Sequence, residues 1–215
     1  QKTVPAISPG SLASQQDGQK VTLAYNFSQG TATSDVRFAV WSTKDGNADL
    51  NWYTATQAAS QILLSEHSGY GEYAIETYQV VDGQEKLIDS TKINFAKPAI
   101  TLVSSISEAG YLDVQVQNLP STTTSVRIPI WSAENGQDDL VWYTATRNSD
   151  GSYSVRAPLK NHKLTTGTYH VHAYVKELQQ TSTSITASSQ FLVEKAHLPN
   201  TTPQLSITNL QAVKG

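Results

Sequence analysis

Apolar and polar residues alternate along much of the chain with a period of two residues. This alternation indicates strands with one buried face, because successive side chains of a strand point to opposite faces. No stretch has the apolar spacing of a long amphipathic helix. The clearest alternating sets are Val21, Leu23 and Tyr25, then Leu112, Val114 and Val116, and then Tyr169, Val171, Ala173 and Val175.

Dipeptides that favour tight turns separate the predicted strands. Asp or Asn followed by Gly accepts positive φ angles at low cost, as the turns of β-hairpins require. Short strands with frequent turns predict an all-β chain of antiparallel sheets. The dipeptides are Asp45-Gly46, Asp82-Gly83, Asn135-Gly136 and Asp150-Gly151.

The chain contains an internal duplication. Residues 36–56 match residues 126–146 at 12 of 21 positions without a gap. Trp41 corresponds to Trp131 at an offset of 131 − 41 = 90, whereas Gly71 corresponds to Gly167 at an offset of 167 − 71 = 96. Six residues were therefore gained or lost between Thr56 and Gly71.

A short opening segment occurs three times along the chain. We therefore predict two tandem immunoglobulin-like antiparallel β-sandwich repeats, at 1–97 and 98–195, followed by a linker and the start of a third repeat at 196–215. Because the third copy is cut off after its start, we expect the parent protein to be a tandem array, and the absence of Met indicates that the sequence is not a complete open reading frame. The three copies are Pro5-Ala6-Ile7-Ser8, Pro98-Ala99-Ile100-Thr101 and Pro203-Gln204-Leu205-Ser206.

Composition excludes several classes of function. The net charge is −3 and no basic cluster is present, which disfavours nucleic acid as a partner. The longest apolar run is four residues, as in Phe38-Ala39-Val40-Trp41, too short for a transmembrane helix or a signal-peptide core. The absence of Cys excludes disulfides, thiolate zinc sites and a Cys nucleophile.

The sequence also offers no set of catalytic residues. It has no Gly-x-Ser-x-Gly elbow, phosphate-binding loop or His-Glu-x-x-His motif. Asp138 and Asp139 are adjacent, so an extended chain points them to opposite faces, unlike the paired carboxylates of glycosidases. We predict that this segment is non-catalytic and needs no cofactor.

The second unit closely resembles the streptococcal Bsp-like repeat. The residues that carry the resemblance are Ile130-Trp131-Ser132, the loop and strand at 135–143, Asp150-Gly151-Ser152-Tyr153, Asn161-His162-Lys163 and the strand at 167–174. The first unit departs from this pattern at 57–64, so a binding role of that region in the first copy stays open.

The resemblance implies a non-catalytic module that targets the cell wall. Such repeats occur in tandem in secreted streptococcal proteins, beside a separate murein hydrolase domain that is either a muramidase or a Cys/His amidase-peptidase. The implied partner is peptidoglycan or a wall-associated polysaccharide. The implied location is secreted and associated with the cell wall, and the parent protein would be an autolysin.

Strand alternation predicts which aromatic side chains face solvent. Trp131 shares a face with Arg127 and not with the apolar residues of its strand, and Trp41 is placed in the same way. On the next strand we assign Trp142 and Trp52 to the core and Tyr143 and Tyr53 to the outer face. In the alternative, a bulge at Pro129 swaps the alternation and all four Trp are core.

Outward aromatic rings beside amide and carboxylate groups suit sugar rings, which stack on π faces and hydrogen-bond through their hydroxyls. The predicted ligand-binding residues are Trp131, Tyr143, Gln137 and Asp139 of the second unit and Trp41, Tyr53, Asn47 and Asp49 of the first. His170, His172 and Tyr174, on one strand face, form a second candidate surface. We expect stronger binding by the second unit.

The histidines and acidic residues have other interpretations. His170 and His172 have a spacing that suits two metal ligands, but only His162 is near enough in sequence to be a third, so a glycan-facing strand is the main prediction. His162 and its counterpart His67 are predicted to anchor loop backbone groups. The run at 45–49 resembles the start of a calcium loop but lacks its later ligands, which favours a hairpin.

Three classes of function therefore remain from the sequence. The first is a wall-binding module, the second is a passive immunoglobulin-like stalk that spaces other domains, and the third is a catalytic domain. We favour the first.

Overall fold

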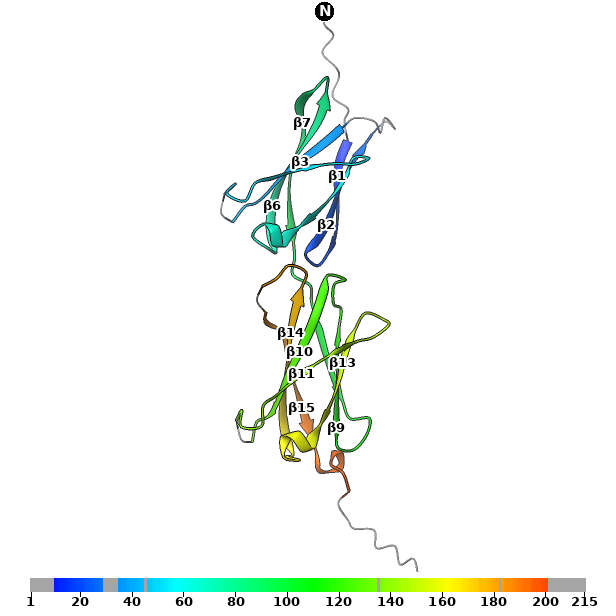
Figure 1. Cartoon of the computed structure of the whole chain (residues 1–215), viewed down its shortest axis with the longest axis vertical. Helices are drawn as coiled ribbons and strands as arrows, with labels where there is room; N and C mark the ends of the chain where they lie inside the picture. The colour runs from blue at the N-terminus through cyan, green and yellow to red at the C-terminus, as the bar shows by residue number, and fades with distance from the viewer. Residues whose placement is uncertain (1–9, 29–34, 45, 135, 182, 201–215) are drawn as a thin grey trace, which may run out of the picture.

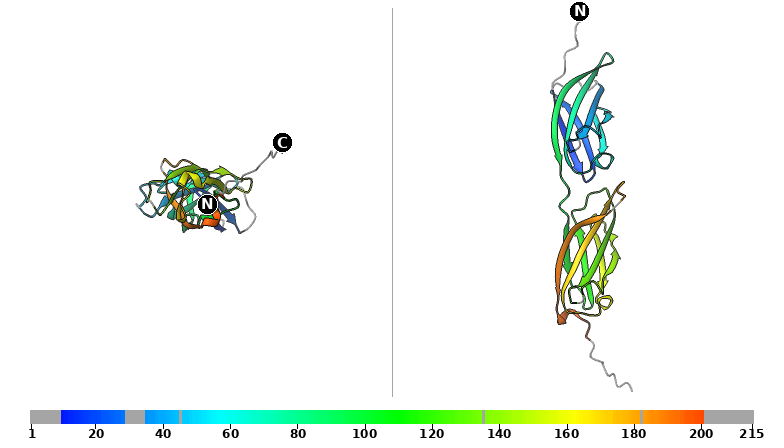
Figure 2. Two further views of the ribbon diagram at one scale, coloured as in Figure 1. Left: turned by 90° about the horizontal axis from the view of Figure 1, so that it is seen from below. Right: turned by 90° about the vertical axis from the view of Figure 1, so that its left-hand side faces the viewer.

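The structure is a computed structural model that describes residues 10–28, 35–44, 46–134, 136–181 and 183–200. Two all-β units lie end to end and form an elongated rod (Figures 1 and 2). Every strand pairing in the described residues is antiparallel, and the regular structure besides strands is limited there to three short 3₁₀ helices. The predicted all-β fold of tandem antiparallel sandwiches is confirmed.

The first unit, unit 1, packs a three-stranded sheet against a four-stranded one. The order is β1-β2-β5 in the first sheet and β4-β3-β6-β7 in the second. The 3₁₀ helix η1 (Leu64–Glu66) follows β5. The strands are β1 (Gly10–Asp17), β2 (Lys20–Phe27), β3 (Asp35–Ser42), β4 (Asn51–Thr54), β5 (Ala59–Leu63), β6 (Gly71–Val81) and β7 (Gln84–Phe95).

The second unit, unit 2, repeats this plan with two four-stranded sheets, ordered β12-β13-β9-β8 and β11-β10-β14-β15. Its 3₁₀ helices are η2 (Leu159–His162) and η3 (Lys195–His197). The strands are β8 (Thr101–Ser105), β9 (Tyr111–Gln117), β10 (Thr123–Ser132), β11 (Val141–Thr144), β12 (Thr146–Arg147), β13 (Tyr153–Pro158), β14 (Gly167–Glu177) and β15 (Ser184–Val193).

Each unit has its own hydrophobic core, built by the residues that alternate inward on facing sheets. Burying one such side chain stabilises the fold by about 1.5–3 kcal/mol, so a core of this size can hold each sandwich together. The buried core of unit 1 is Val21, Leu23, Tyr25, Val36, Phe38, Val40, Ile62, Leu64, Tyr73, Ile75 and Phe95. That of unit 2 is Leu112, Val114, Val116, Val126, Ile128, Ile130, Ala145, Tyr153, Ala157, Leu159, Tyr169, Val171, Ala173, Val175 and Val193.

The six-residue difference between the units divides into two places. His67 and His162 occupy equivalent positions at an offset of 162 − 67 = 95. Unit 2 therefore has five additional residues before this histidine and one additional residue after it. In unit 1, Thr56 bridges to Ala59 through a turn in which Gln57 and Ala58 have φ of 53° and 61°. In unit 2 a longer turn joins β12 to β13 and forms an added hairpin.

Three sequence expectations fall on residues outside the described parts. The opening segment Pro5-Ala6-Ile7-Ser8 is one of them. The start of a third repeat falls mainly on 201–215, and the turn residues Asp45 and Asn135 are single gaps in the description. Among the described residues, no helix has the length and apolarity needed to cross a membrane.

Candidate functional site

The outer face of the sheet β11-β10-β14-β15 carries a cluster of aromatic and basic side chains. On β10, Ile128 and Ile130 are fully buried, while Arg127 is exposed and Trp131 is half-buried on the opposite face. Arg127 pairs with Tyr174 on β14, so both side chains lie on the outer face. We call the set Arg127, Trp131, Trp142, His170, His172 and Tyr174 the aromatic face of unit 2.

These side chains contact one another in two groups. The Arg127 guanidinium lies over the Trp142 ring, 4.9 Å from its centroid, and Trp142 packs against Tyr174 with centroids 4.9 Å apart. Trp131 stacks on His170 at 5.1 Å with an angle of 15° between the rings. Its edge contact to His172 has a centroid distance of 4.8 Å. Ring-to-ring contact fixes the orientation of side chains that are open to solvent on one side.

The assignment of the Trp-Tyr pair on β11 was wrong. Trp142 and Trp52, predicted to be core, are 42% and 39% exposed, whereas Tyr143 and Tyr53, predicted to face outward, turn toward the core. The cause is strand register. Tyr143 lies opposite the buried Ile128, and directly opposite residues of an antiparallel pair point to the same side.

The alternative of a parity swap at Pro129 is also wrong. Arg127 pairs with Tyr174 and Ile130 pairs with Val171, so the register is the same on both sides of the proline (127 + 174 = 130 + 171 = 301). Trp131 therefore keeps the outward position that alternation predicts. Pro129 is buried on this face and lies opposite Trp142.

Tyr143 is held inward by a buried histidine. His162 is 0% exposed, its Nδ1 lies 2.9 Å from the Asp139 carbonyl oxygen, and its Nε2 lies 2.9 Å from Tyr143 Oη. A carbonyl only accepts, so Nδ1 carries the proton and Nε2 accepts from the tyrosine. Burial lowers the pKa of His162, which keeps the ring neutral.

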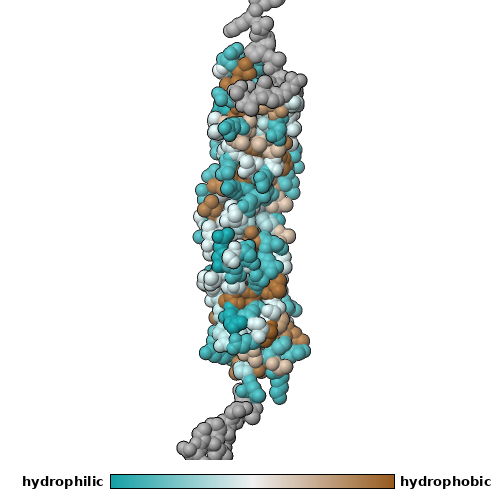
Figure 3. All heavy atoms as spheres, turned by 90° about the vertical axis from the view of Figure 1, so that its right-hand side faces the viewer, coloured by the Kyte–Doolittle hydropathy of each residue, from teal (hydrophilic) through white to brown (hydrophobic). Residues whose placement is uncertain are grey.

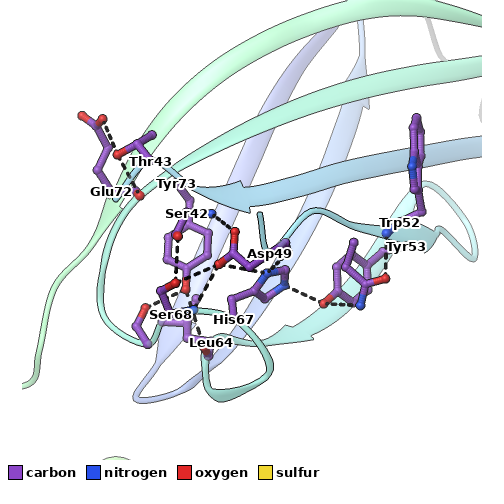
Figure 4. Close-up of polar contacts among 12 residues, drawn as sticks. Ser42, Thr43, Asp49, Trp52, Tyr53, Leu64, His67, Ser68, Glu72 and Tyr73 are labelled. Atoms are coloured by element: carbon purple, nitrogen blue, oxygen red, sulfur yellow. Dashed lines mark hydrogen bonds and ion pairs between the residues drawn. The ribbon is translucent and has the colours of Figure 1, made fainter. Parts of the chain in front are cut away.

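Unit 1 contains the same anchor. His67 Nδ1 lies 3.0 Å from the Asp49 carbonyl oxygen, and His67 Nε2 lies 2.7 Å from Tyr53 Oη (Figure 4). The prediction that His67 and His162 satisfy loop backbone groups is confirmed. Both tyrosine hydroxyls are thus occupied inside the unit.

The predicted loop carboxylates serve the loop itself. Asp139 is buried and accepts hydrogen bonds from Ser132 N at 2.9 Å and Ser132 Oγ at 2.6 Å. Asp49 accepts from Ser42 N at 2.9 Å and Ser68 N at 3.1 Å (Figure 4). Burial alone would raise the pKa of Asp49, but these hydrogen bonds lower it below its usual value. The structure does not bring either carboxylate onto an aromatic face.

Asn47 and Gln137 occupy the loops that join β3 to β4 and β10 to β11. Both residues are exposed. Their carbonyl oxygens accept hydrogen bonds from Leu50 N at 3.2 Å and Leu140 N at 3.1 Å, which close a turn in each loop.

An aromatic face is also present in unit 1, with a different composition. Arg37 lies over Trp52 at 4.9 Å, and Trp52 packs against Tyr78 with centroids 5.1 Å apart. The Arg-Trp-Tyr group is therefore repeated in both units. Trp41, however, lies opposite Ala74, so it has no counterpart of the histidine that stacks on Trp131.

The sequence pattern does not predict the Arg-Trp-Tyr group as a unit, because alternation puts Arg37 and Arg127 on the outer face while Trp52 and Trp142 are assigned to the core. One signal in the sequence was usable: Arg37 precedes Trp52, and Arg127 precedes Trp142, by the same 15 residues (52 − 37 = 142 − 127 = 15). The partner strand register, which brings Tyr78 and Tyr174 beside that Arg, is a property of the folded sheet.

The opposite side of the rod is different in character. It is formed by β1-β2-β5 in unit 1 and β12-β13-β9-β8 in unit 2, and its surface is mainly hydrophilic with scattered apolar areas (Figure 3). In unit 2, Arg156 on this side is paired with Asp113 at 2.7 Å and with Glu108 at 3.0 Å. Arg156 is therefore ion-paired within unit 2, as Arg37 on the aromatic face of unit 1 is with Glu85.

Within the described residues, no group of three or more His, Cys, Asp or Glu side chains is arranged to hold a metal ion. His170 and His172 flank Trp131 on the outer face, whereas His162 is buried on the inner side of the sheet. Burial and the neighbouring His170 lower the pKa of His172. The arrangement suits contact with a ring-shaped or planar ligand.

Comparisons with known proteins concern the family and the fold. The sequence profile of the GBS Bsp-like repeat matches residues 11–93 and 103–190. No curated protein matches the chain. Repeats of this all-β, immunoglobulin-like kind are typically non-catalytic.

Several solved structures are similar to the chain at low sequence identity. The chicken interferon gamma receptor alpha chain is 15% identical, with 87% of this chain and 98% of that chain covered and a TM-score of 0.40. A two-domain fibronectin type III segment of chicken tenascin is 14% identical, with 87% and 100% covered and a TM-score of 0.37. A tetra-tandem repeat from the extending region of a large adhesion protein is 13% identical, with 87% and 50% covered and a TM-score of 0.34.

Proposed function

Since the chain belongs to the GBS Bsp-like repeat family, we propose that it is a non-catalytic module that binds peptidoglycan or a wall-associated polysaccharide. In this proposal the chain is secreted and holds a covalently linked murein hydrolase on the streptococcal cell wall. The observation that supports it is the Arg-Trp-Tyr group with its exposed Trp, which both units build from equivalent strands.

The chemistry of this group matches a wall glycan. A sugar ring can stack its C–H bonds on the open face of Trp142 or Trp131, while hydroxyls and carboxylates accept hydrogen bonds from the Arg127 guanidinium. Arg127 and Tyr174 hold the Trp142 ring in place before a ligand arrives, so little side-chain entropy is lost on binding.

Each face alone binds weakly in this proposal. One stacked aromatic pair contributes about 1 kcal/mol, whereas a millimolar dissociation constant corresponds to about 4 kcal/mol, so a single face needs stacking and hydrogen bonds together to reach even roughly the millimolar range. Weak single contacts suit a module that keeps a hydrolase near its polymeric substrate and still lets it move along the wall. Repetition of the unit then raises the overall affinity.

A passive spacer is the second candidate function. The end-to-end arrangement of the two units as a rod favours it, because a stalk needs length and stiffness and no binding face (Figure 1). A spacer would tolerate loss of the exposed Trp side chains. Substitution of the exposed Trp residues therefore distinguishes a binding module from a spacer.

The test is co-sedimentation of the chain with purified streptococcal sacculi. We expect Trp142→Ala to lower binding about fivefold, which corresponds to the loss of one stacking contact of about 1 kcal/mol. Trp131→Ala should lower binding similarly. Trp52→Ala should lower it less, because the face of unit 1 lacks a histidine beside Trp41 and is expected to contribute less to binding.

The matched control is Val103→Ala, which removes an apolar side chain of similar exposure, 43%, from the opposite sheet. Circular dichroism must show that each variant is folded. Undiminished binding by folded Trp142→Ala and Trp131→Ala would contradict the aromatic-face proposal and support the spacer. Loss of sacculus turbidity caused by this chain alone would contradict its non-catalytic role.

A further inference from the structure

The two units are joined through a buried carboxylate. Glu177, at the end of β14, is 6% exposed. Its side chain accepts hydrogen bonds from Tyr70 Oη at 2.6 Å and Gln19 N at 3.2 Å, both in unit 1. Thr122 Oγ1 of unit 2 donates to the same carboxylate at 2.7 Å. One side chain of unit 2 thus satisfies donors from two separate segments of unit 1.

A second set of contacts lies beside the first. Asp17 of unit 1 accepts a hydrogen bond from Ser121 N of unit 2 at 2.9 Å, and a second from the Ser121 hydroxyl. Gly18 has φ of +59°, and a Cβ there would lie 2.4 Å from Thr122 Oγ1 and 2.5 Å from Glu177 Oε2. The turn between β1 and β2 therefore fits against unit 2 with no room for a side chain.

The segment that connects β7 to unit 2 is also hydrogen-bonded to unit 1. Gln16 Nε2 of β1 donates to the Ala96 carbonyl oxygen at 2.8 Å, just after β7 ends. The buried and fully hydrogen-bonded Glu177 carboxylate, together with this short connector, restricts bending at the joint. We call the contacts of Asp17, Gly18, Gln19, Tyr70, Ser121, Thr122 and Glu177 the inter-repeat joint.

The joint sets the two units in nearly the same orientation about the long axis. In Figure 1 the sheet with β3 and β6 and the sheet with β10 and β14 lie on the same side of the rod. The right-hand view of Figure 2 faces this side and shows β7 and β15 along the same edge. The aromatic faces of both units consequently point in one direction, one repeat apart.

We propose that the two aromatic faces bind one extended glycan strand that lies along the rod, so that the ligand is a linear polymer longer than one repeat. This inference rests on the proposed function. Strand β14 has 11 residues and spans roughly 35 Å at about 3.3 Å per residue, so a disaccharide reaches only one face. A rigid joint presents the second face at high effective concentration without an ordering cost.

The experiment loosens the joint without touching either face. The variants are Glu177→Ala, Gly18→Ala and a Gly-Ser insertion between Lys97 and Pro98, and the control is Glu66→Ala, which removes an exposed carboxylate from η1 at the same end of unit 1. Small-angle X-ray scattering reports the loss of the extended shape. Binding is measured to long glycan strands released from sacculi by an amidase and to the disaccharide released by a muramidase.

We expect the joint variants to bind long strands at least about 10-fold more weakly than the parent chain, with disaccharide binding unchanged. Glu66→Ala should bind both probes like the parent. Unchanged long-strand affinity in a variant that scattering shows to be bent overturns the inference. If Glu177→Ala or Gly18→Ala unfolds, the insertion variant still decides, because it leaves every residue of both units in place.

Failure of the proposed function gives a different result. In that case the parent chain binds neither probe, and the joint variants are indistinguishable from it. Equal affinity of the parent for the disaccharide and for long strands also overturns the inference, because it shows that only one face is used, while the wall-binding function stands.

Discussion

The two units share one scaffold and one surface group but differ around them. Both place Arg, Trp and Tyr in contact on the outer face, and both anchor the preceding loop with a buried histidine. Unit 2 adds His170 and His172 around Trp131, where unit 1 has Ala74 and Glu76. The shared contacts form a scaffold common to both copies, and the differences lie around Trp41 and Trp131.

The largest expected effect concerns the shared histidine anchor. His162→Ala removes the donor to the Asp139 carbonyl and the acceptor of the Tyr143 hydroxyl, and it opens a cavity, so we expect a loss of about 3 kcal/mol from the free energy of unfolding of unit 2. His67→Ala should destabilise unit 1 similarly. Urea denaturation followed by tryptophan fluorescence measures both. If His67→Ala lowers the free energy of unfolding by less than half as much as His162→Ala does, the two histidine anchors are not equivalent.

A smaller effect follows from the lowered pKa of His162. Its usual value is 6.5, and burial lowers the folded value, so the unfolded chain binds the proton more tightly. The contribution to stability is therefore fully present above pH 6.5 and is lost as pH falls through that value toward the folded pKa. Urea titrations above and below pH 6.5 measure this loss for unit 2.

The variant His162→Gln is the control for this pH dependence, because it keeps a polar side chain that does not titrate in this range. Its stability should change less with pH between neutral and acidic conditions than that of the parent chain. An equal pH dependence in both proteins would assign the effect to other groups.

The smallest expected effect concerns the Thr56–Ala59 turn of unit 1, which stands where unit 2 has the β12–β13 hairpin. Gln57 has φ of 53°, a conformation that costs energy for most residues and less for Asn. We expect Gln57→Asn to stabilise unit 1 by about 0.5 kcal/mol in urea denaturation, with unit 2 unchanged. A destabilised unit 1 would mean that the exposed Gln57 side chain makes a contact that matters.

Much of the fold followed from the sequence because its signals are local. Alternation at Val21, Leu23 and Tyr25 predicts a half-buried strand, and each of these residues is buried. The repeated Gly-x-Tyr segment likewise predicts the equivalence of Tyr73 and Tyr169, both fully buried in their units. These predictions need only the period of a strand and a comparison of two copies.

The candidate site could be predicted only in part. Alternation within β10 predicts Trp131 on the outer face, and alternation within β14 predicts His170, His172 and Tyr174 on one face as a second candidate surface. The structure brings all four to the outer face of one sheet. The predicted sides of Trp142 and Tyr143 are the reverse of those in the structure. The reason is that β11 has only four residues, and its apolar side chains point to both faces of the sheet. Within so short a segment the pattern does not say which side is buried.

The sequence by itself determined the duplication, the strand period and the absence of Cys-based chemistry, since these depend on residue identity and spacing alone. Only the tertiary structure decided that Tyr143 points inward, because register against Ile128 sets its side of the sheet. It also decided the joint at Glu177, whose donors at Gln19 and Tyr70 are far away in the chain. Contacts between distant segments depend on strand register and on how the folded units pack against each other, and a local sequence pattern determines neither.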